Sequence, residues 1–87
     1  MHTDEYEISL FRELDVCKKR IAGLQKKIAR MERKHDMKTG VFIEAFNKGD
    51  LDKHNDSYRT WFRYCHAFGV WRERLEQYEE AFRSMKI

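Results

Sequence analysis

The sequence predicts an all-α protein: an antiparallel coiled-coil hairpin of two long helices with a short helix in the connection. Its 87 residues contain no proline and only four glycines, so long helices meet few breakers. Good helix formers dominate both ends of the chain. In two long segments the apolar residues recur at alternating spacings of three and four, the period of a helix packed along one stripe. We therefore expect one helical domain spanning residues 1–87.

The first long segment, from about residue 4 to residue 35, carries an aliphatic seam. The members of this seam are Leu10, Leu14, Cys17, Ile21, Leu24, Ile28 and Met31. Their spacings of 4, 3, 4, 3, 4 and 3 residues form an unbroken heptad pattern. His35 extends the same seam by one further step. The pattern predicts that all these side chains lie on one side of a helix that packs against a partner.

The second long segment, from about residue 56 to residue 85, carries an aromatic seam with the same alternation. Its members are Trp61, Tyr64, Phe68, Trp71, Leu75, Tyr78, Phe82 and Met85. Either Asn55 or Asp56 is placed to cap the start of this helix. Because one seam is bulky and the other slim, the two helices are expected to fill the space between them when they face each other.

The connection between the two segments predicts a short helix over about residues 40–48. Thr39 is placed to cap its start, and Gly49 follows its end, where a positive φ is needed. We expect this helix to cover the loop end of the hairpin together with Trp61. The residues expected to turn inward there are Phe42, Phe46 and Leu51.

One hairpin of this length has a narrow core, and a single small core rarely supplies more than about 3–5 kcal/mol of stability. The aromatic seam also has more surface than one slim partner covers. Pairing of two copies into a four-helix bundle resolves both problems, so we expect a homodimer. Exposed members of the aromatic seam are natural anchors for a partner. The seam residues expected in the core or the oligomer interface are Leu14, Cys17, Ile21, Leu24, Ile28, Trp61, Phe68, Trp71, Leu75 and Tyr78.

Charge is distributed unevenly along the first long segment. Residues 1–17 carry five acidic residues and one basic residue, a net charge of −4, whereas residues 18–38 carry nine basic and two acidic residues, a net charge of +7. We call the outward cations of this region the basic stripe. The stripe comprises Lys18, Lys19, Lys26, Lys27, Arg30 and Arg33. It is interpreted as a solvated face or as a docking face for an acidic partner, with nucleic-acid binding through phosphate contacts as the alternative.

No catalytic, cofactor-binding or metal-binding residue is assigned, and an enzyme is not expected. The four histidines lack the spacing of zinc motifs, and the serines lack the glycines of a nucleophile elbow. In an antiparallel hairpin Cys17 lies level with roughly residue 75, so Cys65 is about 15 Å away along the axis, beyond disulfide reach. Both cysteines are interpreted as buried thiols, with an intersubunit disulfide and a reactive thiol as the alternatives.

The composition favours a cytoplasmic protein with no membrane association. No apolar run approaches the ~20 residues needed to cross a bilayer. The acidic first residues lack the basic and then apolar pattern of a signal peptide. Two cysteines without an export signal favour a reducing compartment.

Part of the chain, about residues 31–76, contains a distinctive set of residues: Met37, Phe42, Phe46, Gly49, Leu51, Asp56, Trp61 and the run Arg74-Leu75-Glu76. In these residues the segment resembles a group of small, mostly uncharacterised prokaryotic helical proteins, many of which look like antitoxins of toxin–antitoxin pairs. The chain departs from the shared pattern at His35-Asp36, where the group has a Tyr-Gly step, and at Lys53-His54-Asn55, where more acidic residues are expected. The resemblance implies a toxin as the protein partner.

These observations together predict a non-catalytic protein–protein interaction module that self-associates and holds a second protein. The alternative is a helical protein that binds nucleic acid with the basic stripe.

Overall fold

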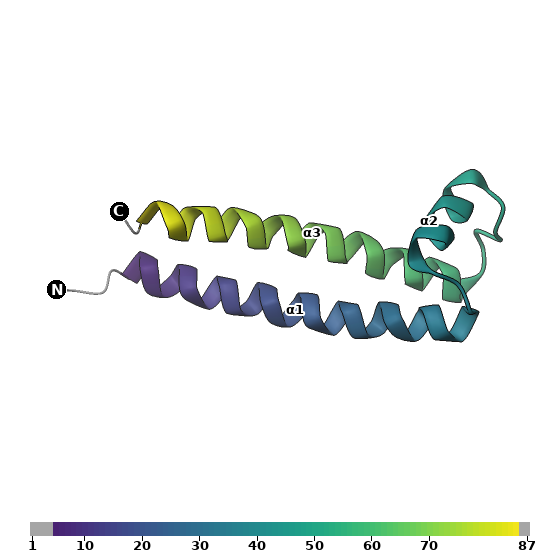
Figure 1. Ribbon diagram of the computed structural model, residues 1–87, viewed down its shortest axis with the longest axis horizontal. Helices are drawn as coiled ribbons and strands as arrows, with labels where there is room; N and C mark the ends of the chain where they lie inside the picture. Colours follow the sequence, from purple (N-terminus) through teal and green to yellow (C-terminus); the bar gives the residue numbers. More distant parts are fainter. Residues whose placement is uncertain (1–4, 86–87) are drawn as a thin grey trace.

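The computed structural model describes residues 5–85, which form three helices and no strand. Helix α1 spans Glu5–His35, α2 spans Thr39–Lys48 and α3 spans Asp56–Met85. The long helices α1 and α3 run antiparallel and pack against each other, while α2 lies at the loop end (Figure 1). The predicted all-α class and the packed pair of long helices are confirmed. Helix α2 begins one residue earlier than predicted. The predicted start of the first helix, near residue 4, lies outside the described residues.

The two long helices keep one register along their length. At the open end the Phe11 and Phe82 rings lie 6.1 Å apart, and further along Arg20 lies 5.7 Å from the centre of the Trp71 ring. The hairpin thus shows no slip or bulge between these levels. In this register Cys17 lies near the level of Arg74, and the thiols of Cys17 and Cys65 are both free.

The residue that directly follows α1, and the one that directly follows α2, each have a positive φ. Gly49 has φ 83°, as predicted, and the Asp50 N–H donates to the Ala45 carbonyl at 2.9 Å. The end of α1 was not predicted in this form: Asp36 has φ 48°, and the Met37 N–H donates to the Glu32 carbonyl at 3.1 Å. These bonds satisfy carbonyls that would otherwise lack a partner at the helix ends.

The helix starts are held by side chains, one of them unexpected. Asn55 caps α3, because its side-chain oxygen accepts a bond of 3.1 Å from the Tyr58 N–H. The prediction that Thr39 caps α2 is wrong. Lys38 occupies the N-cap position without a side-chain bond, and Thr39 is the first helical residue.

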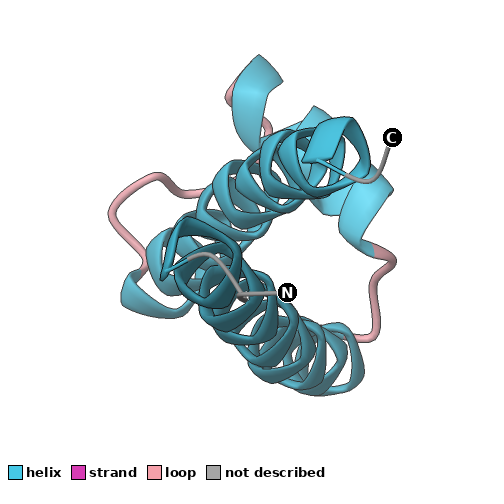
Figure 2. Ribbon diagram, turned by 90° about the vertical axis from the view of Figure 1, so that its left-hand side faces the viewer, coloured by secondary structure: helices cyan, strands magenta, loops and turns pink. Residues whose placement is uncertain are grey.

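The fully buried core is thin. The buried apolar side chains of the described residues are Leu10, Cys17, Ile21, Phe42 and Trp61. The molecule measures 58 × 21 × 18 Å, and its radius of gyration is 17.2 Å, whereas a compact domain of this length has about 12 Å. Seen from the open end, the two long helices lie side by side (Figure 2). Most of the hairpin is therefore only two helices thick.

Candidate interaction surfaces

Three of the ten predicted seam residues are buried, and the other seven are only partly covered. Cys17, Ile21 and Trp61 are buried. The half-buried members are Leu14, Leu24, Ile28, Phe68, Trp71, Leu75 and Tyr78. A complete core would bury such large apolar side chains almost fully. The seam therefore keeps apolar surface on both flanks of the hairpin.

The loop end is the best-packed part of the molecule. The Trp61 ring lies between Phe42, whose ring is parallel to it at a centroid distance of 3.9 Å, and His35, stacked at 5.5 Å. Phe46 of α2 stacks in turn on Phe62 of α3 at 4.9 Å. We call these residues the loop-end cluster. They join all three helices, so the inward placement predicted for Phe42 and Phe46 gives this end a core of its own.

One hydrogen bond and one unpaired donor mark the interior of the loop-end cluster. The His35 Nε2 atom and the Ser57 hydroxyl share a hydrogen bond of 2.7 Å. The Trp61 indole N–H is buried and has no hydrogen-bond partner among the described residues. An unpaired buried donor has a free-energy cost of about 1–3 kcal/mol. Because the ring packs between two others, its dispersion contacts offset that cost.

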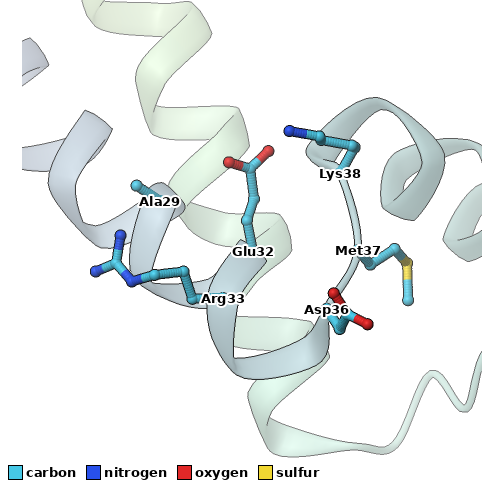
Figure 3. Close-up of a pocket in the computed structure, with 6 residues that line it drawn as sticks. All are labelled: Ala29, Glu32, Arg33, Asp36, Met37 and Lys38. Carbon is cyan, nitrogen blue, oxygen red and sulfur yellow. The ribbon is translucent and has the colours of Figure 1, made fainter.

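Glu32 ties α1 to the start of α2. Its carboxylate accepts hydrogen bonds from the Thr39 backbone N–H and hydroxyl, each of 2.8 Å. Figure 3 shows this carboxylate rising from α1 beside the connection, with Lys38 reaching over the same notch. The two bonds from Thr39 lower the pKa of Glu32, and the charge of Lys38 acts in the same direction. Glu32 thus supplies the cap that Lys38 lacks.

The open end has the opposite character. Large apolar side chains of the first half of α1 are exposed to solvent: Phe11 by 64%, Tyr6 by 59% and Ile8 by 42%. Val16 is exposed by 40%. We call these four residues the open-end cluster. The heptad pattern missed them, because it selects only the residues that face the partner helix.

An apolar groove runs between the long helices on the side that α2 occupies, and we call it the α2 groove. Ile28 and Ala29 of α1 line one wall, and Cys65 and Phe68 of α3 line the other. Ile43 of α2 closes it at the loop end. The polar lining residues are Gln25, Glu32 and Thr39. One sequence pattern marks this flank of α1: Phe11, Ala22 and Ala29 recur at spacings close to whole helical turns.

A second groove lies on the opposite flank around Trp71. Its walls carry Lys19, Arg20 and Lys27, with Ala67 beside the ring. The guanidinium carbon of Arg20 lies 5.7 Å from the Trp71 ring centre, and that of Arg74 lies 4.9 Å from it. Cations at these distances are attracted to the ring face. A base that stacked on Trp71 would have to displace one of them.

All six residues of the basic stripe are exposed. Lys19, Lys26, Arg30 and Arg33 each follow a seam residue by two positions, which is about 200° around the helix. They therefore form one line on the face of α1 turned away from α3. Lys19 pairs with Asp15 at 2.9 Å. Within residues 5–85, no carboxylate lies within ion-pair distance of the other three, so their charges are open to a partner.

The described residues offer little reactive chemistry. Burial raises the pKa of both cysteine thiols, with Glu13 adding to the effect at Cys17 and Glu32 at Cys65. Such thiols stay protonated and are poor nucleophiles. No group of three or more His, Cys, Asp or Glu side chains within residues 5–85 is placed to hold a metal ion. None of the three helices, over the described range, is long and apolar enough to cross a membrane.

Comparisons with protein-family models, with curated proteins and with solved structures find no match to this chain. Three features of the hairpin are open to a partner: the exposed side chains of the open-end cluster, the α2 groove and the basic stripe.

Proposed function

We propose that the chain is a non-catalytic protein–protein interaction module that self-associates through a flank of its hairpin to form a four-helix bundle. One observation carries the proposal. The chain exposes 6850 Å² of surface, whereas a compact monomer of its mass, 10.7 kDa, exposes about 5,500 Å². The excess, roughly 1,300 Å², is larger than the ~800 Å² that each partner buries in a standard protein interface.

The partly covered seam supports the same proposal. Two half-buried seam side chains, Ile28 and Phe68, line the α2 groove. A second hairpin laid against this flank would cover them and convert a two-helix seam into a four-helix core. The free thiols of Cys17 and Cys65 support placing this module in the cytoplasm.

The first experiment is a solution mass by size-exclusion chromatography with light scattering. We expect twice the chain mass of 10.7 kDa for the wild type. Ala29→Glu puts a charge into the α2 groove and should give a folded monomer. Gln77→Glu adds the same charge on an exposed position of α3 and should stay dimeric. A monomeric wild type, or a dimer unaffected by Ala29→Glu, would contradict the proposal.

The identity of a second protein partner is proposed from the resemblance to antitoxins alone. The chain would neutralise a toxin by covering its active surface with the faces that the bundle leaves outside. Co-expression with any small reading frame that adjoins its gene tests this. We expect that frame to arrest growth alone and growth to resume when this chain is co-expressed. A harmless neighbouring frame, or unrelieved arrest, would contradict the antitoxin role.

The second candidate function is nucleic-acid binding, favoured by the unpaired charges of Lys26, Arg30 and Arg33. A gel-shift assay with duplex DNA and RNA at low and moderate salt tests it. If this function is correct, changing Lys26, Lys27 and Arg30 to Gln abolishes the shift.

The matched control removes an equal charge outside the basic stripe, by changing Lys48, Lys53 and Arg83 to Gln. It should leave the shift in place. The absence of any shift for the wild type at low salt would eliminate nucleic-acid binding.

A further inference from the structure

The two halves of the hairpin carry net charges of opposite sign. Its open half, residues 5–17 and 73–85, carries eight acidic and three basic residues, a net charge of −5. The loop half, residues 18–72, carries 14 basic and six acidic residues, a net charge of +8. Both long helices change sign near the same level, because they run antiparallel in one register. The polarity therefore belongs to the hairpin as a whole.

This polarity distinguishes the two ways in which a second copy can lie on the same flank. If the two hairpins were parallel, each positively charged loop half would lie on the other, within the ~8–10 Å over which charges interact at physiological salt. If they were antiparallel, each acidic open half would lie on a basic loop half. Like charges across an interface cost free energy, whereas complementary ones set its register.

The apolar surfaces of the flank fit the antiparallel arrangement. Phe11 and Ala29 are 18 residues apart, five whole turns, so they lie on the same flank of α1 about 27 Å apart. Phe11 is 64% exposed, and Ala29 is the small residue that lines the α2 groove. A two-fold axis across α1 midway between them places Phe11 of each copy over Ala29 of the other. A large exposed ring then meets a small residue in an apolar groove, twice.

We propose, on the basis of the self-association proposed above, that the occupant of the α2 groove is a second copy of this chain in antiparallel orientation, with Phe11 of each copy seated in the groove of the other. The exposed Phe11 ring and the α2 groove are then two halves of one interface. Helix α2 closes the groove at its loop end and so limits how far the partner helix extends along it. The charge polarity fixes the direction, and the Phe11 contact fixes the register.

Spin-label distances between the two copies test the orientation. Both labelled proteins carry Cys65→Ala, whose dimeric mass is checked first, and retain the fully buried Cys17. A label at Lys53→Cys, in the exposed loop, should give a distance close to the 58 Å long axis of the molecule. A label at Lys19→Cys, level with the two-fold axis but on the face of α1 turned away from α3, should give a much shorter distance and serves as the control for dimer formation.

Each outcome is decisive. A short distance at Lys19 with a long one at Lys53 supports the proposal. Short distances at both positions show a parallel dimer, which overturns the antiparallel orientation and leaves the proposed self-association standing. Dipolar coupling at neither position overturns both. Salt gives a second measurement: raising it weakens an antiparallel dimer and tightens a parallel one.

The Phe11 contact has its own matched pair of variants. Phe11→Ala removes one groove contact from each copy, so we expect the dissociation constant of the dimer to rise roughly 100-fold, about tenfold for each contact. Val41→Ala is the control, because Val41 is similarly exposed, by 58%, but lies on α2 away from the α2 groove. Equal dissociation constants for the two variants would overturn the register.

Discussion

The two ends of the hairpin differ in how completely they bury their large apolar side chains. At the loop end, three helices meet around Trp61 and Phe42, and neither side chain has any exposed surface. At the open end only two helices meet, and Phe11 remains 64% exposed although it touches Phe82. A third helix of only ten residues is enough to complete the core at one end. The loop end is therefore packed by contacts within one chain, whereas the open end has no third helix to cover its large side chains.

The largest expected effect is a difference in stability between alanine substitutions at the two ends. Trp61→Ala should destabilise the fold by about 3–5 kcal/mol, because it removes a fully buried ring and leaves a cavity. Phe11→Ala, measured at concentrations where the protein is monomeric, should cost less than about 0.5 kcal/mol, since little apolar surface is lost from the core. Urea unfolding followed by circular dichroism measures both. Similar losses would show that the ends do not differ in this way.

Hydrogen exchange should show the same difference without mutation. In dilute protein we expect amides in the first three turns of α1 to exchange faster than those near His35, because local opening there exposes few buried contacts. Raising the protein concentration should slow exchange at the open end more than at the loop end, since the dimer covers both halves but the loop end is already packed within one chain. A gap that does not change with concentration in a demonstrated dimer would contradict this prediction.

A smaller effect sharpens the description of the loop end. Asp36 has φ 48°, a conformation that glycine adopts without a steric penalty. Asp36→Gly should therefore raise the stability by about 0.5–1 kcal/mol, and Asp36→Ala should not. Thermal unfolding of both variants measures the difference.

The smallest effect depends on pH. Because the folded protein lowers the pKa of Glu32, its carboxylate contributes stability that is present above its unfolded pKa and is lost as the pH falls through the folded value. Glu32→Gln should therefore be less stable than the wild type near neutral pH, by less than about 1 kcal/mol because the site is partly exposed. The difference should vanish in acid. Parallel stability curves from neutral pH into acid would show that Glu32 does not act in this way.

Local patterns predicted most of the fold. The alternation of three and four placed the long helices and their seam residues, and Gly49 and Asn55 marked helix ends by well-understood backbone chemistry. The bond between Glu32 and Thr39 was not predictable from pattern, because it depends on the path of the connection in space. The α2 groove was missed for the same reason, since its walls come from three helices. Dimerisation, the partner and the role of the basic stripe stay predictions.

The unbroken register between α1 and α3 makes the lengths of the two long helices depend on each other. Inserting or deleting one heptad in α1 would leave the seam of α3 facing the wrong level unless α3 changed by one heptad as well. The loop between α2 and α3 faces no such constraint, because residues 49–55 match no seam. Among natural variants we therefore expect the two long helices to lengthen or shorten together in steps of about seven residues, while this loop varies singly.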